Sequence, residues 1–319
     1  MNVLSLFDGM SCGQIALQKA GIKYDKYFAS EIKPLGIKVT QENFPNTIQL
    51  GSVTEIEGKD LPKIDLLIGG SPCQNLSKAM ATEHRKGLEG EKSGLFYEYY
   101  RLFKETNPTY FFLENVGSMS KKDEAIITEL MGVEPIRINS KLVSPQLRNR
   151  LYWTNIPGIK QPKNNGPLLN EILTDGWSDR DKARCLLESD SRPVTTPIKM
   201  FHRYYSPGFN TLIFKDQYHY INCKNHYETH FKDLSAKQID EKILTENIDL
   251  EVYNGLRFMN QKEMEMCQTI PKGYTKSLTR HEAAGLLGDG WTVDVIAHIF
   301  KGVNYPSTKD RGASGFADN

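Results

Sequence analysis

Cysteine is scarce and unpaired in this chain of 319 residues. The five cysteines are odd in number and form no C-x-x-C pair, which disfavours a zinc module or a disulfide framework and predicts reduced thiols and no metal site. No apolar run is long enough to span a membrane. Asp8 and Gly9 interrupt the first apolar run too early for a signal peptide, so a cytoplasmic location is expected.

An excess of charge of one sign is also missing. The chain carries 40 Lys and Arg against 39 Asp and Glu, which gives a formal net charge of +1. Global charge therefore does not indicate a nucleic-acid partner, and any basic surface must be local. The length accommodates one large domain and a smaller one.

The first half of the chain alternates apolar runs with amphipathic segments. This alternation predicts the α/β class, with a doubly wound, mostly parallel sheet built from right-handed crossovers. The expected strands are 2–7, 24–30, 47–50, 64–68, 110–114, 136–139 and 151–154. The expected helices are 14–20, 34–43, 94–106 and 123–131.

The composition changes after Gly158. A stretch rich in Tyr, His, Phe, Asn and Lys runs from 199 to 231, and we interpret 156–255 as a second, smaller and irregular domain. Helix-like segments at 261–267, 280–287 and 292–300 are expected to return to the first domain. The first domain is therefore predicted to comprise 1–155 plus 256–319.

One cysteine follows a conformationally restricted segment at the end of a predicted buried strand. Gly69 and Gly70 permit tight backbone geometry, and Pro72 restricts its own φ and the conformation of Ser71 before Cys73. Ligand sites in open α/β sheets lie at the carboxyl ends of strands. A lone Pro-Cys is more often a packed cysteine than a nucleophile.

A carboxylic acid, Glu114, ends the buried strand 110–114. The two strand ends are expected to bring Cys73 and Glu114 to one cleft. A thiolate beside an acid can attack a heteroaromatic ring and protonate it.

The segment 7–13, with sequence FDGMSCG, joins the first strand to the first helix. It is not a G-x-G-x-x-G motif, so a dinucleotide is a poor fit. A glycine turn at a helix N-terminus, together with Glu31 after the second strand, favours an adenosine-containing cofactor. The alternative is a plain turn and a solvated acid.

Gln146, Arg148 and Arg150 are spaced two residues apart. In an extended strand their side chains point the same way and form a donor cluster for phosphates or for the edge of a base. The alternative is a solvated edge strand, which the apolar run at 151–153 disfavours.

Taken in order, these motifs resemble those of the cytosine carbon-5 DNA methyltransferases over nearly the whole chain. The similar segments are Phe7–Gly13, Glu31, Gly70–Gln74, Glu114–Val116, Gln146 with Arg148 and Arg150, and Leu286–Phe300. Other details lean toward the animal de novo branch, in a bacterial or phage-like single-chain enzyme. Three departures stand out: Ser52 replaces the family's usual Asp or Asn, Asp289-Gly290 replaces the usual Asn-Ser, and the region 156–255 matches no part of the family pattern.

The resemblance implies a class I, Rossmann-like methyltransferase fold that binds S-adenosyl-L-methionine. The implied cofactor contacts are Phe7, Asp8, Gly9, Ser11, Cys12, Gly13, Glu31, Ser52, Val53, Gly70, Pro72, Leu95, Asp289, Gly290 and Trp291.

The implied catalytic residues are Cys73, Glu114, Arg148 and Arg150. A cytosine is rotated out of duplex DNA, Cys73 adds to carbon 6, and carbon 5 accepts the methyl group. Glu114 stabilises the ring at nitrogen 3. Arg150 holds the base carbonyl, and Arg148 orients Glu114 or a phosphate.

The implied partner is double-stranded DNA, with a cognate restriction endonuclease as a compatible second partner and a monomer as the expected form. The polar segment 75–87 is expected to close over DNA, the alternative being a mobile surface loop without a DNA role. The domain at 156–255 is expected to recognise the target sequence. The implied DNA contacts are Asn75, Ser77, Lys78, Met80, Arg85, Lys86, Gln146 and Arg203.

Two other functions remain open at this point. A transfer-RNA cytosine-5 methyltransferase would reuse Cys73 and Glu114 on a loop instead of a duplex. A catalytically silent DNA-binding regulator would keep the fold without the reaction, although the joint retention of Cys73, Glu114 and Arg150 argues against it.

Overall fold

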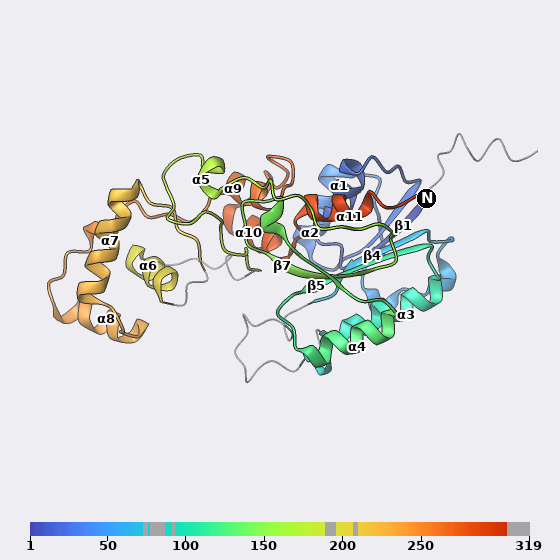
Figure 1. Cartoon of the computed structure of the whole chain (residues 1–319), viewed down its shortest axis with the longest axis horizontal. Coiled ribbons are helices and arrows are strands. Elements are labelled where there is room, and N and C mark those ends of the chain that lie inside the picture. The colour runs from blue at the N-terminus through green and yellow to red at the C-terminus, as the bar shows by residue number, and fades with distance from the viewer. Residues whose placement is uncertain (73–75, 77–86, 91–92, 189–195, 207–209, 305–319) are drawn as a thin grey trace, which may run out of the picture. The chain divides into compact units, whose positions relative to one another are not determined.

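The computed structural model describes residues 1–72, 76, 87–90, 93–188, 196–206 and 210–304 (Figure 1). The chain divides into two compact units. Unit 1 comprises Met1–Ile138, Asn149–Pro162 and Val293–Asn319, and unit 2 comprises Asn139–Arg148 and Lys163–Thr292. Within the described residues, no helix has the length and apolarity needed to cross a bilayer.

Unit 1 is built around a seven-stranded sheet with the order β3-β2-β1-β4-β5-β7-β6. The strands are β1 (Asn2–Leu6), β2 (Lys26–Ser30), β3 (Ile48–Gln49), β4 (Leu66–Gly70), β5 (Tyr110–Val116), β6 (Ile136–Asn139) and β7 (Asn149–Thr154). The first five strands pair in parallel, whereas β7 runs antiparallel to β5. The predicted doubly wound, mostly parallel α/β sheet is confirmed.

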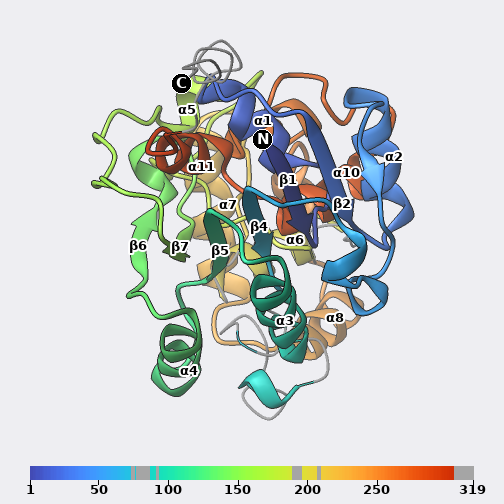
Figure 2. The ribbon, with the colours of Figure 1, turned by 90° about the vertical axis from the view of Figure 1, so that its right-hand side faces the viewer.

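Helices cover both faces of this sheet (Figures 1 and 2). The helices of unit 1 are α1 (Cys12–Lys19), α2 (Pro34–Asn43), α3 (Phe96–Thr106), α4 (Lys121–Met131) and α11 (Val293–Phe300). On one face, α3 and α4 bury Tyr99 and Ile127 in a cluster with Leu67 and Leu113. On the other face, Phe300 of α11 packs edge-on against Phe112, with ring centroids 5.3 Å apart.

The helix ends follow local chemistry. Pro34 occupies the first turn of α2, where its missing N–H costs nothing. The Ser120 hydroxyl accepts a hydrogen bond from the Asp123 backbone N–H and caps α4, and Gly132 ends that helix at φ 70°. Short 3₁₀ turns occupy Val53–Glu55 (η1), Gly58–Asp60 (η2), Gly87–Glu89 (η4), Ser93–Leu95 (η5), Ser140–Leu142 (η6) and Glu251–Tyr253 (η8).

Unit 2 is largely helical, which differs from the irregular domain predicted for 156–255. Its helices are α5 (Leu169–Ile172), α6 (Pro197–Tyr205), α7 (Gln217–His230), α8 (Ala236–Thr245), α9 (Gln261–Cys267) and α10 (Arg280–Asp289). Cys223, Tyr227 and Phe231 recur every four residues along α7 and form a buried core with Phe201 of α6 and with Tyr253. The aromatic richness of this stretch therefore reflects packing of α6 against α7.

The grouping of α9 and α10 also differs from the sequence-based boundary at 256. Glu263 of α9 is fully buried and pairs with Arg257, with Nη1 2.8 Å from Oε2. Gln268 donates a hydrogen bond to the Leu287 carbonyl at the end of α10. These contacts lie within unit 2, so both helices belong to it in the structure.

Candidate active site

Strands β2, β1, β4 and β5 are parallel neighbours, so their carboxyl ends lie along one edge of the sheet. The chain reverses its direction of winding between β3 and β4, and β4 returns beside β1. Ligands of open α/β sheets bind at such a switch point. Three of the predicted motifs, the turn after β1, Glu31 after β2 and Glu114 in β5, stand at this edge.

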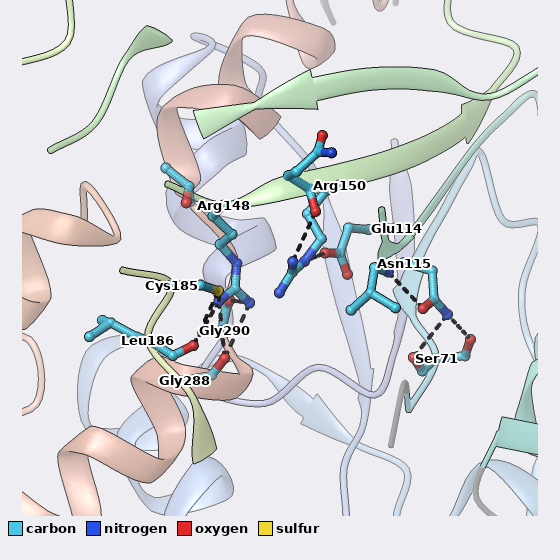
Figure 3. A network of polar contacts seen from close by, with 12 residues as sticks. Ser71, Glu114, Asn115, Arg148, Arg150, Cys185, Leu186, Gly288 and Gly290 are labelled. Carbon is cyan, nitrogen blue, oxygen red and sulfur yellow. Dashed lines mark hydrogen bonds and ion pairs between the residues drawn. The ribbon is translucent and has the colours of Figure 1, made fainter. Parts of the chain in front are cut away.

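The segment leading to Cys73 is held against the end of β5. Gly70 is the register partner of Glu114 across the β4–β5 pair. The Asn115 side-chain nitrogen donates to the Ser71 hydroxyl at 3.0 Å and to the Ser71 carbonyl at 3.3 Å (Figure 3). Ser71 and Asn115 are both buried. The backbone two residues before Cys73 is thus fixed beside the predicted acid, while Cys73 itself lies outside the described residues.

Glu114 forms an ion pair with Arg150. The Arg150 Nε lies 2.7 Å from Glu114 Oε1, and only 12% and 10% of the two side chains are exposed. Figure 3 shows the guanidinium of Arg150 turned toward the carboxylate. Arg148 was expected to orient Glu114 or a phosphate. The contact with Glu114 is made by Arg150 instead, because β7 pairs antiparallel with β5 and places Arg150 opposite Val116, two residues along.

Arg148 instead holds a turn of unit 2. Its guanidinium donates to the carbonyl oxygens of Leu186 at 3.3 Å, Gly288 at 3.2 Å and Gly290 at 2.6 Å (Figure 3). The side chain is buried with these partners. The guanidinium thus satisfies carbonyls at the carboxyl end of α10, which have no partner inside the helix.

Gln146 forms hydrogen bonds to residues at the end of α9 in unit 2. Its amide nitrogen donates to the Cys267 carbonyl at 2.7 Å and to Gln268 Oε1 at 2.9 Å, and the residue is fully buried. The expectation of one extended face for Gln146, Arg148 and Arg150 is wrong, because β7 begins only at Asn149. The three side chains reach three different sets of partners.

Gln268 is a member of this network that the sequence did not single out. It donates to the carbonyls of Leu287 at 2.5 Å and Gly290 at 3.2 Å and accepts from the Thr292 hydroxyl. The predicted cofactor residues Asp289, Gly290 and Trp291 sit at this turn, with Trp291 buried.

The turn after β1 has an unusual backbone. Phe7, Gly9 and Ser11 have φ values of 58°, 61° and 61°, so two residues with side chains occupy the left-handed region. Ser11 is the N-cap of α1, and Cys12 and Gly13 form its first turn. The N–H groups at such a helix start can face a ligand.

The Asp8 carboxylate supports this turn from inside. It accepts hydrogen bonds from the hydroxyls of Ser5 at 2.6 Å, Tyr27 at 2.7 Å and Ser11. Burial raises the pKa of Asp8, although these hydroxyl donors oppose the shift. Asp8 was predicted to contact the cofactor, and in the structure its oxygens are engaged by three hydroxyl groups of the protein.

Glu31, directly after β2, accepts a hydrogen bond from the turn that follows β1. Its carboxylate accepts backbone N–H bonds from Gly9 at 2.7 Å and from Ile32 and Lys33 at 2.8 Å. Ile32, which the sequence analysis did not single out, is 69% exposed. The sequence signal for Ile32 as a candidate contact residue is an isoleucine directly after the acid that follows the second predicted strand.

The remaining predicted cofactor residues also have defined positions in unit 1. Ser52 caps η1, where its hydroxyl lies 2.8 Å from the Thr54 hydroxyl, and Val53 is buried beside it. Gly70 ends β4 and Pro72 is half-buried. Leu95 is the residue before α3.

Six of the eight predicted DNA contacts fall within the segment 75–86. Asn75, Ser77, Lys78, Met80, Arg85 and Lys86 lie outside the described residues. Arg203 is half-buried on α6 in unit 2, and Gln146 is buried as described. Among the described residues, no group of three or more His, Cys, Asp or Glu side chains could hold a metal ion.

Solved structures share this fold. A methyltransferase of Entamoeba histolytica, EhMeth, superposes with a TM-score of 0.66 at 15% identity and covers 95% of this chain and 97% of that chain. A DNMT2 mutant of Spodoptera frugiperda has a TM-score of 0.64 at 16% identity and covers 94% of this chain and 98% of that chain.

Curated relatives come from phages and bacteria. Orphan methyltransferase M.SPRI of Bacillus phage SPR is 30% identical over 269 residues, which cover 78% of this chain and 58% of that protein. Type II methyltransferase M.NgoBV of Neisseria gonorrhoeae is 31% identical over 198 residues, or 54% of this chain and 46% of that protein. This chain thus spans about half the length of these relatives.

The family profile described as C-5 cytosine-specific DNA methylase matches residues 1–304. The match includes every motif on which the resemblance was based. This chain belongs to the C-5 cytosine-specific DNA methylase family.

Proposed function

We propose that this chain is an S-adenosylmethionine-dependent DNA (cytosine-5-)-methyltransferase. The observation that carries the proposal is the pairing of Gly70 with Glu114, reinforced by the bonds from Asn115 to Ser71. This arrangement holds the chain that leads to Pro72 and Cys73 beside a carboxylate. Family membership supports the same assignment.

The residues at the sheet edge fit the proposed cofactor. The helix start after Ser11 offers N–H donors, and Glu31 offers carboxylate oxygens for hydroxyl groups. Exposed Ile32 provides apolar surface for a planar base. When bound, S-adenosylmethionine would supply the transferred methyl group. Asp289, Gly290 and Trp291 remain proposed contacts by the resemblance alone.

The catalytic roles follow from the chemistry of cytosine. Cys73 thiolate adds to carbon 6, which makes carbon 5 nucleophilic enough to accept a methyl group. Glu114 shares a proton with ring nitrogen 3 as charge develops there, and Arg150 fixes the orientation of that carboxylate. Loss of the proton from carbon 5 then expels Cys73 and restores the ring.

The proposed substrate is duplex DNA, from which the cytosine must be rotated out at a cost of a few kcal/mol. The segment 75–87 is proposed to close over the DNA, and 156–255 to select the sequence. Because the relatives include a type II methyltransferase, a restriction endonuclease of matching specificity is the proposed partner, and a monomer is the proposed working form.

Bisulfite sequencing of DNA from cells that express the chain tests this proposal. We expect methylated cytosines with the wild type and none with Cys73→Ser, although the variant should still bind DNA. Duplex DNA containing 5-fluorocytosine should trap a covalent adduct with the wild type alone. Label transferred from the cofactor to transfer RNA but not to duplex DNA would overturn the proposed substrate. A folded wild type that forms no adduct would favour the silent regulator.

A further inference from the structure

A network of buried polar groups lies beneath the turn that follows β1 in unit 1. Asp8 of this turn accepts hydrogen bonds from hydroxyl groups of Ser5 in β1, Tyr27 in β2 and Ser11 at the start of α1. Thr40 of α2 donates to the Ser11 hydroxyl at 3.2 Å. All of these residues are buried, so the network connects the turn to the elements around it away from solvent.

The backbone of this turn is strained. Phe7 and Ser11 have φ values of 58° and 61°, although both residues carry side chains. Residues other than glycine persist in the left-handed region only where the surrounding structure holds them there, and such positions cluster at ligand sites. The hydrogen bonds to Asp8 therefore stabilise a conformation that the turn by itself would not favour.

The Ser11 hydroxyl does not play the usual part of a serine at a helix start. An N-cap serine normally accepts a bond from an N–H of the first turn, but within the described chain the Ser11 side chain makes no capping bond. It donates to Asp8 instead and accepts from the Gln14 amide at 3.1 Å. Side-chain capping of α1 is thus left to another acceptor, and a carboxylate is favoured at a helix N-terminus. S-adenosylmethionine carries such a group.

Tyr27 supplies its donor from the interior of the sheet. The residue is 2% exposed, and its hydroxyl donates to Asp8 Oδ1 at 2.7 Å. Burial and the nearby charge of Asp8 raise the pKa of Tyr27 well above its ordinary value, so the phenol keeps its proton at neutral pH. A Cβ at position 13 would lie 2.7 Å from the same hydroxyl, which therefore also lies against the first turn of α1.

We propose that Tyr27 is a positioning residue for the cofactor: through Asp8 it holds the turn at residues 7–11 and the start of α1 in the conformation that binds S-adenosylmethionine. The hydroxyl acts on the turn and not on the cofactor, because its contact is with the carboxylate that supports the turn from inside. This inference rests on the proposed function, since it concerns the cofactor of that reaction.

Equilibrium dialysis of the full chain with labelled S-adenosylmethionine tests the inference, because it measures binding and not turnover. Tyr27→Phe removes one hydroxyl and keeps the ring. We expect the Kd for the cofactor to rise roughly tenfold, or about 1.4 kcal/mol, near the lower end of the range for a hydrogen bond to a charged group. The rate of methyl transfer at saturating cofactor should stay near that of the wild type.

Tyr99→Phe is the matched control. Tyr99 of α3 is also fully buried in unit 1, and its hydroxyl donates to the Phe112 carbonyl at 3.0 Å. This variant should lower the thermal midpoint but keep the wild-type Kd for the cofactor. Any result in which Tyr27→Phe does not raise that Kd more than Tyr99→Phe would overturn the inference.

A double-mutant cycle shows whether Tyr27 acts through Asp8. Asp8→Asn nearly keeps the size of the side chain and removes its charge. We expect the Kd of the double variant to exceed that of the wild type by less than the product of the two single increases, because residues in one network are not independent. Increases that multiply would contradict action through Asp8.

Thr40→Val gives an independent measurement if Tyr27→Phe does not fold. It removes the hydroxyl that donates to Ser11, so it should also raise the Kd for the cofactor. An unchanged Kd in this folded variant would then overturn the inference.

The same proteins separate this inference from the proposed function. Folded wild-type protein that binds the cofactor but methylates no DNA would count against the proposed reaction. An unchanged Kd in Tyr27→Phe, with methylation by the wild type intact, would remove this inference alone. Absence of cofactor binding by folded wild-type protein would remove both.

Discussion

The Nε atom of Arg150 lies 2.7 Å from Oε1 of Glu114, across the antiparallel β5–β7 pair. Both side chains are largely buried, so the pair is weakly screened by solvent. Glu114 therefore cannot be considered as an isolated acid. Its orientation depends on a guanidinium that comes from a distant part of the sequence.

Replacing Arg150 tests whether its ion pair with Glu114 is needed for catalysis or only for folding. We expect Arg150→Ala to lower the rate of methyl transfer by roughly 10²- to 10³-fold, the usual cost of one preorganised donor. Single-turnover kinetics at saturating DNA measure this rate. Arg137→Ala is the control, since Arg137 of β6 pairs with Glu124 of α4 in the same unit. A comparable rate loss in both variants would contradict a specific role for Arg150.

Replacing Asn115 tests whether the segment before Cys73 must be held in place for methyl transfer. Asn115→Ala removes both hydrogen bonds to buried Ser71, which should cost about 1–3 kcal/mol of unfolding free energy. We also expect the single-turnover rate to fall well below that of the wild type, because misplaced reacting groups lose orientation.

Asn155 provides the matched control for this change. It accepts the Phe111 N–H at 2.9 Å and donates to the Thr109 carbonyl at 3.0 Å, at the opposite end of β5. Asn155→Ala should alter denaturant unfolding without changing the rate of methyl transfer by folded protein. Equal rate losses in the two variants would show that Asn115 acts through stability alone.

Arg148 is expected to act on the cofactor instead of on the base. Arg148→Lys cannot reproduce the bonds to Leu186, Gly288 and Gly290, so the turn that carries Trp291 should loosen. We expect the KM for S-adenosylmethionine to rise roughly tenfold or more, with the KM for DNA unchanged.

Arg257→Lys separates this effect from general weakening of unit 2. Arg257 binds Asp175 and Glu263 in the same unit and contacts no predicted cofactor residue among its described partners. The variant should lower the thermal midpoint but keep the KM for the cofactor. If both variants raise that KM equally, Arg148 has no specific positioning role.

A side chain at position 13 should destabilise the folded protein. A Cβ at this position would overlap Ile68 Cδ1 and lie 2.7 Å from the Tyr27 hydroxyl, between α1 and the sheet. Gly13→Ala is expected to destabilise the protein by about 1–3 kcal/mol. Gly94→Ala is the control, because among the described residues its Cβ would meet only the Leu88 carbonyl, at 3.5 Å. Denaturant titration compares the two, and equal midpoints would contradict the packing argument.

Acid should destabilise unit 2 through its histidines. Burial lowers the pKa of His226 below its ordinary value of 6.5, and neighbouring His230 lowers it further, whereas Asp249 opposes the shift. The unfolded chain binds more protons than the folded chain between the two pKa values. Stability is therefore fully present above pH 6.5 and is lost as the pH falls toward the folded pKa.

We expect the thermal midpoint to fall between pH 7.5 and pH 5.5, and His226→Gln to reduce this fall. Burial also lowers the pKa of His202, so part of the dependence should remain in the variant. Exposed His281 supplies the control variant His281→Gln, which should keep the wild-type slope. A slope identical in all three proteins would exclude His226 as a contributor.

The sequence by itself determined the alternation of strands and helices, the motif order and the family. Apolar runs and turn residues are local, so the strands beside Glu31, Gly70 and Glu114 could be predicted, although β4 and β5 end two residues later than expected, at Gly70 and Val116. Even the helix bounds at Pro34 and Asn43 could be predicted, because capping and proline effects act over a few residues.

Only the tertiary structure decided which arginine serves which partner. A spacing of two residues predicts one face only while the strand continues, and β7 begins at Asn149. Arg148 is therefore drawn to carbonyls some 140 residues away, and Arg150 to Glu114 on a neighbouring strand. Buried donors and acceptors must find partners wherever the fold places them, and those partners are remote in sequence.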